Sequence, residues 1–342
     1  MAYRRILVGT DGSVSAERAE RAAIRLADAL VAELRVVFAS DDLRADATGR
    51  AVRAAVDAEV SVSSVVRPGP PQRALVGEAG HWHADLVVVG DRGMGGLRGV
   101  ALGSVPDSIS HDSRSDVLIV RTREDRDRGQ GAYRRILIGT DGTPTADRAV
   151  WRAADLGREL GSKLVLVFVG HAVTGRNVLE DTASQLEQVE VETRVLEGDP
   201  AGAIVGAAED VGADVVVVGS KGMAGAKRLP TGSVPNRISH RASSDVLIVR
   251  THRGALRDVV PGQGAIVEEG GKELAVYREP SGETIVLSAK CRHLGCTVDW
   301  NPVELTWDCP CHGSRYARDG SLMRGPATEG LPRVEPGALR RA

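Results

Sequence analysis

The sequence predicts an α/β fold of two similar parallel-sheet domains followed by a small all-β domain. Three observations predict it: a long segment occurs twice, apolar runs alternate with helical periodicity inside each copy, and the last part has only short strand-like runs between Pro and Gly turns. The length of 342 residues agrees with two to three domains of about 150 residues each.

The repeat is long and close. Residues 2–12 (AYRRILVGTDG) return at 132–142 with one difference, Val8 against Ile138, and residues 103–122 return at 232–251 with 15 of 20 positions the same. A unit of this size is a duplicated domain rather than a short solenoid repeat. We therefore expect domains at 1–123 and 132–252, a charged, Gly-containing linker at 124–131, and a third domain at 257–342.

Within the first copy, strand and helix patterns alternate. Strands are expected at Arg5–Val8, Leu34–Ala39, Val60–Val66, Asp85–Gly90 and Val117–Arg121. Helices are expected where Ala19, Ala23, Leu26 and Leu30 recur at helical spacing, over 71–81 after a starting Pro, and from Val105. This alternation predicts an open parallel sheet with helices on both faces.

Composition excludes several classes of protein. With 44 basic and 46 acidic residues, the net charge of -2 argues against a strongly basic nucleic-acid binder. No apolar stretch approaches 18 residues, so we expect no membrane span and a cytoplasmic protein. The four cysteines all lie between 291 and 311, which in a cytoplasmic chain points to metal or redox chemistry.

Each copy carries the same glycine pattern at the sheet edge where ligands bind. Asp11 and Asp141 follow the first strand of each copy. The fourth strand is followed by Gly90-x2-Gly93-x9-Gly103-Ser104 and by Gly219-x2-Gly222-x9-Gly232-Ser233. Glycines allow backbone amides to approach a phosphate, and a helix N-terminus favours anions. The plainer interpretation is that these glycines serve turns only, but four matched elements in both copies favour nucleotide binding.

This pattern resembles the ATP-binding universal stress proteins over 1–123 and 132–252. The resemblance implies Rossmann-like folds, binding of ATP or another adenine nucleotide with or without Mg²⁺, and an internal pseudo-dimer of the two repeats. It places Asp11 and Asp141 near the nucleoside, and assigns the phosphates to Gly90, Gly93, Gly103, Ser104, Gly219, Gly222, Gly232 and Ser233. The chain departs from the family at Pro106 and Pro235, where Ser or Thr is common.

The third domain contains two Cys/His boxes, Cys291-x-His293 and Cys309-x2-His312. Two thiolates and two imidazoles can hold a [2Fe–2S] cluster, and imidazole in place of thiolate raises the reduction potential. A set of two cysteines and two histidines can also hold structural zinc. Zinc would need neither the second cysteine pair nor the Ser and Tyr of C-P-C-H-G-S-x-Y.

The two boxes resemble the Rieske iron–sulfur family. The resemblance implies that Cys291 and Cys309 ligate one iron and His293 and His312 the other. It further implies a Cys296–Cys311 disulfide. Hydrogen bonds from Ser314 and Tyr316 would then place the potential in the upper part of the range of about −150 to +300 mV.

Together the motifs predict a redox or stress protein with a Rieske cluster for electron transfer or redox sensing, fused to an ATP-binding tandem and working with a redox donor or acceptor protein. The alternative is a stress-response nucleotide-binding protein in which the cluster is accessory. An enzyme is disfavoured because we find neither a G-x4-G-K-[ST] loop nor a mononuclear-iron site. A homo-oligomer of the chain is compatible with either interpretation.

Overall fold

The computed structural model describes residues 3–41, 48–92, 102–122, 133–220, 234–250, 259, 261–269, 272–302, 304–309 and 311–334. It divides into two compact units, Met1–Arg250 and Thr251–Ala342. Gly93, Gly222, Gly232 and Ser233 lie outside the described residues. Among the helices that are described, none combines the length and the apolar character needed to cross a membrane.

The first repeat alternates strands and helices as the sequence predicts. Its elements are β1 (Arg5–Thr10), α1 (Val14–Leu30), β2 (Glu33–Ala39), α2 (Gly49–Asp57), β3 (Val62–Arg67), α3 (Pro71–Trp82), β4 (Leu86–Gly90), α4 (Ser104–Asp112) and β5 (Asp116–Val120). Helix α1 begins at Ser13, whose hydroxyl accepts a hydrogen bond from the Ala16 amide at 3.2 Å. Helix α2 is not expected from the sequence, because its buried face consists of only Ala51 and Ala55, a weak hydrophobic signal.

The second repeat follows the same order. Its elements are β6 (Arg135–Gly139), α5 (Pro144–Leu160), β7 (Lys163–Val169), α6 (Ala172–Ser184), β8 (Val191–Leu196), α7 (Pro200–Asp210), β9 (Val215–Gly219), α8 (Val234–Arg241) and β10 (Asp245–Val249). Thr143 caps α5 as Ser13 caps α1, accepting from the Ala146 amide at 3.3 Å.

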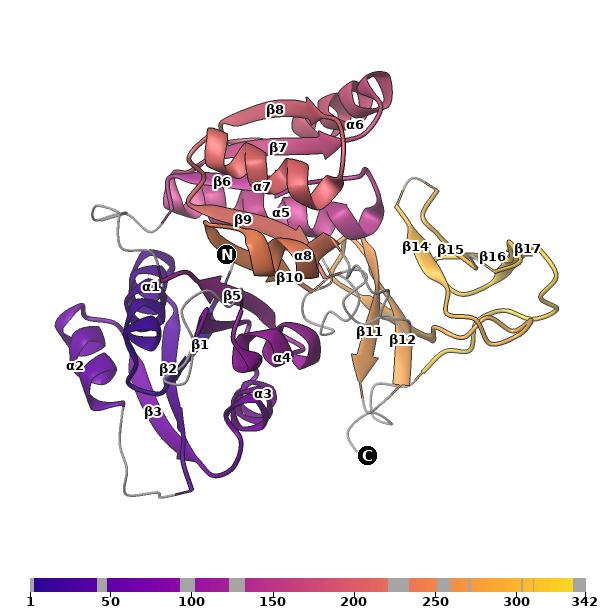
Figure 1. The fold of residues 1–342 in the computed structure, drawn as a ribbon. Coiled ribbons are helices and arrows are strands. Elements are labelled where there is room, and N and C mark those ends of the chain that lie inside the picture. Colours follow the sequence, from indigo (N-terminus) through magenta and orange to yellow (C-terminus); the bar gives the residue numbers. More distant parts are fainter. Residues whose placement is uncertain are drawn as a thin grey trace. The chain divides into compact units, whose positions relative to one another are not determined.

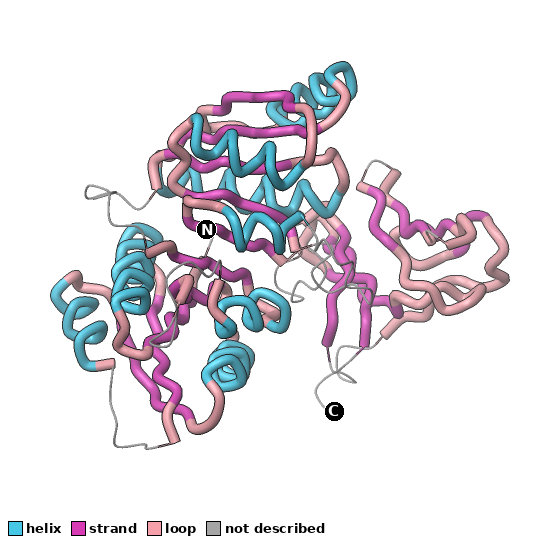
Figure 2. Tube along the Cα trace, in the orientation of Figure 1, coloured by secondary structure: helices cyan, strands magenta, loops and turns pink. Residues whose placement is uncertain are grey.

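All ten strands of the two repeats form one sheet, in the order β3-β2-β1-β4-β5-β10-β9-β6-β7-β8 (Figures 1 and 2). Each half is parallel, but β5 and β10 pair antiparallel, with Leu118 opposite Leu247. We call this junction the seam. The sheet is therefore mixed, because two parallel half-sheets meet edge to edge with their strands running in opposite directions.

Two continuous hydrophobic layers cover the sheet. One face packs against α1, α2, α5 and α6, and the other against α3, α4, α7 and α8. Side chains alternate between the layers along each strand, as Ile6, Leu7 and Val8 do along β1. Because both layers contain residues from both repeats, the tandem has shared cores that cross the seam.

Buried carboxylates connect the repeats at the seam. The Tyr3 hydroxyl donates to Asp116 Oδ2 at 2.9 Å, and the Arg250 amide of the second repeat donates to Asp116 Oδ1 at 2.8 Å. Arg152 of α5 also approaches Asp116, with its Nε 3.2 Å from Oδ2. Burial raises the pKa of Asp116 above its usual value, and the charge of Arg152 acts in the opposite direction.

The same arrangement recurs on the other side of the seam. The Tyr133 hydroxyl donates to Asp245 Oδ2 at 3.0 Å, and the Arg121 amide donates to Asp245 Oδ1 at 2.9 Å. Burial lowers the pKa of the Arg250 guanidinium to about 10. In each repeat, one buried aspartate therefore accepts a hydrogen bond from a backbone amide of the other repeat.

Two histidines also contact residues across the seam. The position of His111 and His240 near helix ends suggests helix capping from sequence. In the structure His240 Nε2 lies 3.2 Å from Asp107 Oδ1, and His111 Nε2 lies 3.3 Å from the side-chain Nδ2 of Asn236. These histidines thus join α4 to α8 across the two repeats.

The C-terminal unit has two small antiparallel sheets. Strands β11 (Gly264–Glu269), β12 (Lys272–Arg278) and β13 (Thr284–Ser288) form one, and β14 (Asp299–Asn301), β15 (Thr306–Asp308), β16 (Arg315–Ala317) and β17 (Leu322–Arg324) form the other. Two of the chain's four Trp and two of its four Tyr lie in this core. Large aromatic rings bury much apolar area per residue, which suits a core this small.

Replacing Asp116 with Ala should destabilise the tandem. The change leaves Arg152, the Tyr3 hydroxyl and the Arg250 amide without their buried carboxylate. We expect the free energy of unfolding, measured by urea denaturation, to fall by about 3 kcal/mol. The control, Asp210→Ala at an exposed position of α7, should change it by less than about 0.5 kcal/mol. Equal losses in the two variants would contradict this role.

Candidate functional site

Each Cys/His box forms the same tight turn. In the first, the Gly295 amide donates to the Cys291 carbonyl at 2.9 Å, and in the second the Gly313 amide donates to the Cys309 carbonyl at 3.0 Å. Both glycines have positive φ, 72° at Gly295 and 73° at Gly313, a conformation that other residues rarely adopt. The two boxes are therefore matched loops, one between β13 and β14 and the other between β15 and β16.

The loops separate thiols from imidazoles. Cys291 and Cys309 are each only 3% exposed, whereas His293 and His312 are exposed. The two imidazole rings lie with their centroids 4.9 Å apart and nearly perpendicular. The arrangement places two thiols inside the unit and two imidazoles at its surface.

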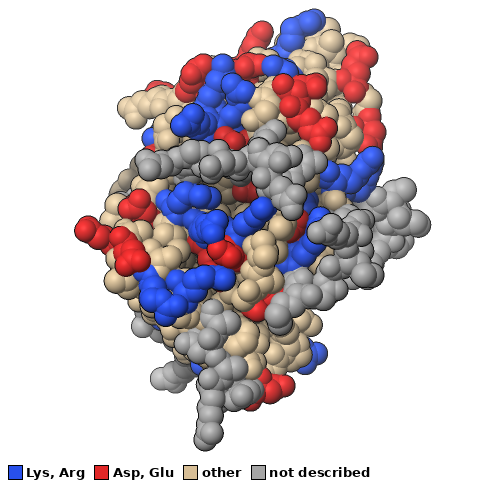
Figure 3. Space-filling view, turned by 60° about the vertical axis from the view of Figure 1, so that its left-hand side comes forward, with Lys and Arg blue, Asp and Glu red and all other residues tan. Residues whose placement is uncertain are grey.

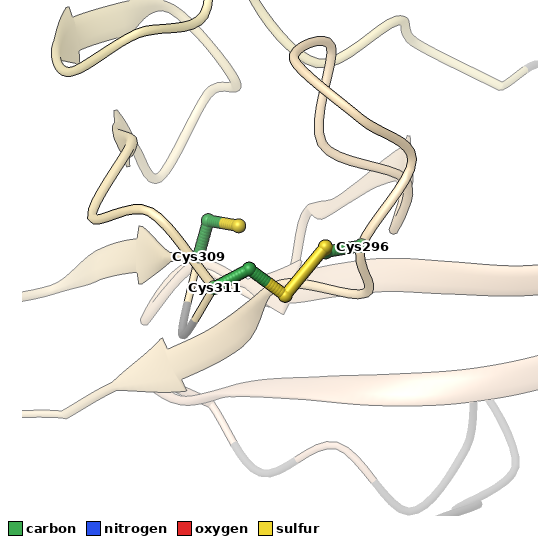
Figure 4. A group of neighbouring side chains, drawn as sticks. All are labelled: Cys296, Cys309 and Cys311. Carbon is green, nitrogen blue, oxygen red and sulfur yellow. A yellow bond between two sulfur atoms is a disulfide. The ribbon is translucent and has the colours of Figure 1, made fainter.

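A disulfide joins the loops. Cys296 of the first loop is bonded to Cys311 of the second, the pair that the Rieske resemblance implies, with their Cα atoms 6.6 Å apart (Figure 4). The Cys309 sulfur lies beside this bond, within 4.8 Å of both of its sulfur atoms. The cross-link therefore fixes one loop against the other next to a free thiol.

The buried Tyr316 contacts the thiol of the first loop, Cys291. Its hydroxyl is 3.1 Å from Cys291 Sγ and accepts the Arg292 amide at 3.2 Å, so its own proton can point at the sulfur. Burial acts to raise the Cys291 pKa, but hydrogen bonds, of which the largest are from Tyr316 and the His293 backbone and the others from Cys309 and Ser314, together lower that pKa below its usual value. Burial and the contact with Cys291 raise the pKa of Tyr316 to about 12.

Ser314 is held in the same way. It is fully buried, and its hydroxyl accepts the Ala327 amide at 3.2 Å. The hydroxyl oxygen is thereby oriented and its proton is left to donate toward Cys291, whose pKa this contact also lowers. The buried hydroxyls of Ser314 and Tyr316 thus converge on one thiol.

The two aspartates after the first strands occupy equivalent turns. Asp11 Oδ1 accepts the Ser13 amide at 2.9 Å, and Asp141 Oδ1 accepts the Thr143 amide at 3.0 Å. Asp11 is half-buried and Asp141 is exposed. Each carboxylate therefore stabilises the approach to a helix N-terminus, and its side chain remains accessible beside the carboxyl end of the sheet.

The described glycines of the phosphate-type pattern also have packing roles. Gly90 ends β4 where a Cβ would lie 2.7 Å from the Ser15 carbonyl oxygen, and Gly103 precedes Ser104, the first residue of α4. Gly219 ends β9. The close approach of Ser15 explains why only glycine fits at residue 90.

A buried polar group beside Gly90 is not among the residues expected from the sequence. Asp91 is 3% exposed and accepts hydrogen bonds from the Ser15 and Thr122 hydroxyls. The signal available in the sequence was the difference between the two copies, since Ser220 stands in the second repeat at the position of Asp91.

Comparison with known families agrees with this division of the chain. The model of the universal stress protein family matches residues 2–59, 42–121, 132–179 and 170–250, which together are most of the chain. The chain belongs to the universal stress protein family. Residues 251–335 match the Rieske [2Fe-2S] domain, so this universal stress protein consists of a tandem followed by a C-terminal Rieske domain.

Individual relatives cover one part or the other. A universal stress protein of Mycolicibacterium smegmatis is 32% identical over 49% of the chain and 62% of its own length. Cytochrome b6-f complex iron-sulfur subunit 2 of Nostoc sp. is 58% identical over 18% of the chain and 35% of its own length. The chain thus spans less than two thirds of the length of either relative.

A universal stress protein from Archaeoglobus fulgidus has a similar fold. Its crystal structure matches with a TM-score of 0.55 and 20% identity, over 73% of this chain and 98% of the archaeal one. The match supports the fold of the tandem.

Removing the disulfide should weaken the C-terminal unit. The bond closes a loop with a sequence separation of 15 residues, for which chain-entropy arguments give about 3 kcal/mol. We expect the double variant Cys296→Ala/Cys311→Ala to lower the free energy of unfolding by about this amount, followed by tryptophan fluorescence in urea. The exposed-site variant Met323→Ala serves as the control. A double variant as stable as this control would show that the cross-link does not stabilise the unit.

Proposed function

We propose that this protein is a one-electron carrier or redox sensor whose Rieske domain holds its [2Fe–2S] cluster through Cys291, His293, Cys309 and His312. The observation that carries the proposal is the separation of two buried thiols from two exposed imidazoles on matched, cross-linked loops. The donor set fits: two thiols and two imidazoles are the Rieske ligands.

The chain's own residues would set the properties of this centre. When bound, a Rieske cluster supplies a one-electron couple between about −150 and +300 mV. The hydroxyls of Tyr316 and Ser314 would stabilise negative charge at Cys291 and so favour reduction. The exposed imidazoles would exchange electrons and protons with a partner.

The surface around the imidazoles supports docking of a redox partner. Leu294 follows His293 and is 67% exposed, so an apolar side chain stands beside the proposed ligands. Its loop also carries Arg292, which pairs at the surface with Glu329 at 2.7 Å. A partner protein would therefore contact a surface of this chain whose centre is the apolar side chain of Leu294.

Iron content tests the proposed ligands. Because Cys309 is buried and not part of the disulfide, we expect Cys309→Ser to abolish binding of two iron and two sulfide per chain, measured by chemical analysis after reconstitution. Arg292→Gln changes the same pair of loops without removing a ligand and should retain the iron. A Cys309→Ser protein that keeps its iron would refute the assignment of Cys309.

The reduction potential tests the Tyr316 hydrogen bond. Removing the hydroxyl in Tyr316→Phe takes a donor from Cys291 Sγ, and a loss of about 1 kcal/mol for the reduced state corresponds to about 40 mV. We expect a potential lower by this amount in protein-film voltammetry. The matched change Tyr277→Phe, in the same core and away from the thiols, should leave the potential unchanged. An unchanged potential in Tyr316→Phe would show that the hydrogen bond from Tyr316 does not raise the reduction potential.

We further propose that the tandem binds ATP or another adenine nucleotide. The matched glycine patterns and the equivalent Asp11 and Asp141 turns support this. In that proposal Gly90, Gly103 and Ser104, with Gly219 of the second copy, would face the phosphates. Equilibrium dialysis with labelled ATP tests it, and absence of binding at millimolar ATP would refute it.

A second candidate function is a nucleotide-binding stress protein in which the cluster is accessory. The size of the tandem, which includes Met1–Arg250, favours it. The two proposals differ in the effect of Cys291→Ser on function in cells. That variant should abolish function if the cluster is central, and leave it intact if nucleotide binding alone matters.

A further inference from the structure

A groove lies between the end of β3 and one face of α3 in the first repeat. We call it the α3 groove. Its volume is about 450 Å³, and Arg67, Arg73, Gly77 and His81 are among the residues that line it. Residues 73, 77 and 81 are four apart, so they share one face of the helix. Strand β3 is an edge strand and is separated from β4 by β2 and β1, so the groove is distinct from the glycine pattern that follows β4.

A buried carboxylate held by two arginines lines the α3 groove. Glu78 of α3 is 3% exposed, with Arg35 Nη1 2.8 Å from its Oε1 and Arg67 Nη2 2.6 Å from its Oε2. Arg35 is fixed further, because its Nε donates to the Ser63 hydroxyl at 3.0 Å and its guanidinium lies 4.5 Å from the centre of the Trp82 ring. Two cations thus share one carboxylate, whose two oxygens are both occupied.

The second repeat has apolar residues at the equivalent positions. Where the first repeat has Arg35, Arg67, Glu78 and Trp82, the second has Val165, Leu196, Ala207 and Val211. The packing of this helix on the sheet therefore does not require ions. Apolar residues in place of a buried ion pair often leave stability unchanged or raise it. The charges of the first repeat thus point to a ligand rather than to packing.

At the start of the equivalent helix, the second repeat carries an anion of its own. Asp199 Oδ2 accepts the Gly202 amide at 2.9 Å, and Arg237 contacts both carboxylate oxygens at 2.6 Å. The hydrogen bonds from Arg237 and then from Gly202 lower the pKa of Asp199 below its usual value. This position at the N-terminus of α7 therefore stabilises negative charge.

The first repeat has no such carboxylate. Pro70 precedes α3 at the position of Asp199, and no side chain caps this helix. The backbone is nevertheless alike, with φ −61° and ψ 135° at Pro70 against φ −71° and ψ 122° at Asp199. The two repeats thus present the same helix entrance, filled by a carboxylate in one and left without it in the other.

Two arginines at this entrance keep donors for a ligand. Arg67 uses its Nε and Nη2 on Glu78, and its side chain is still 41% exposed. Arg73 in the first turn of α3 is exposed, and it has no acidic partner within the part of the chain that the structure describes. Asp41 contacts the same turn, where its Oδ1 accepts the Gly69 amide at 2.8 Å, but it does not line the groove.

The attraction for an anion is local. The chain has a net charge of -2, and on the face shown in Figure 3 blue Lys and Arg side chains are intermixed with red Asp and Glu side chains. No excess of positive charge over the whole molecule favours anions. An anion in the α3 groove would be held by the groups that line it.

We propose that the α3 groove binds the phosphate monoester of a small organic molecule, with the phosphate where the Asp199 carboxylate lies in the second repeat. One arginine suffices for the single charge of Asp199, whereas Arg67 and Arg73 suit the nearly double charge of a phosphate. The organic part would lie along Gly77 toward His81. The volume falls in the range of about 300–1,000 Å³ of small-molecule sites. This site depends on neither the cluster nor ATP.

Isothermal titration calorimetry of the full chain with glycerol phosphate tests the proposal. We expect binding to the wild type, and binding weaker by about tenfold in Arg73→Gln, because one charge-assisted contact is lost. Arg73 is exposed, so the variant should fold. Arg53→Gln removes the same charge from an exposed position of α2 and should bind like the wild type.

Two further variants occupy the groove with the chain's own atoms. Pro70→Asp introduces the carboxylate that the second repeat has at the same helix entrance, so the fold should tolerate it and binding of glycerol phosphate should be lost. A Cβ at Gly77 would meet no atom within 4 Å, so Gly77→Leu places its side chain in open space and favours the helix. It should also abolish binding, whereas Gly77→Ala should retain it.

The outcomes decide between the site and its absence. A wild type that does not bind glycerol phosphate would overturn the proposal. Binding that is equal in the wild type, Pro70→Asp and Arg73→Gln would place the ligand elsewhere and overturn it as well. Succinate is the dicarboxylate probe, and binding as tight as that of glycerol phosphate would overturn the assignment to a phosphate. Circular dichroism verifies the fold of each variant, and Gly77→Leu keeps the test decisive if Pro70→Asp does not fold.

Discussion

The antiparallel pairing of β5 with β10 is the contact on which the tandem depends. It converts two five-stranded parallel sheets into one sheet and buries an edge that each repeat would otherwise expose. Asp116 and Asp245 stabilise the same junction, because each accepts a backbone amide from the opposite repeat. Two cores that extend across the seam then make the repeats one unit, although each has its own candidate site.

Duplication has allowed the two halves to diverge where symmetry is not required by packing. The turn at Asp11 is repeated at Asp141, and the capping hydroxyl of Ser13 is repeated at Thr143. The buried seam aspartates are also repeated, as Asp116 and Asp245, but other buried carboxylates are not. Asp91 and Glu20 in the first half correspond to Ser220 and Val150 in the second. The same fold can therefore carry different charges in its two halves.

Much of the architecture could be predicted from the sequence because the signals are local and occur twice. Continuous apolar runs such as residues 85–90 predict buried parallel strands, and the cysteine spacing indicates the matched loops of the C-terminal unit. The seam could not be predicted, since the pairing of β5 with β10 depends on edges far apart in sequence. The contacts of His111 and His240 across it were missed for the same reason. The hydrogen bond between Tyr316 and Cys291 was implied only by resemblance, and the burial of Asp91 depends on Ser15 and Thr122, both distant in the chain.

The central claim is that the C-terminal unit holds a redox-active cluster through both thiol and imidazole ligands. Pulsed electron paramagnetic resonance of the purified full chain, after reduction with dithionite, tests it most directly. The account predicts a signal that appears only on reduction and couples to two nitrogen nuclei, those of His293 and His312. A cluster signal without nitrogen coupling, or a chain that binds zinc and gives no signal, would contradict it.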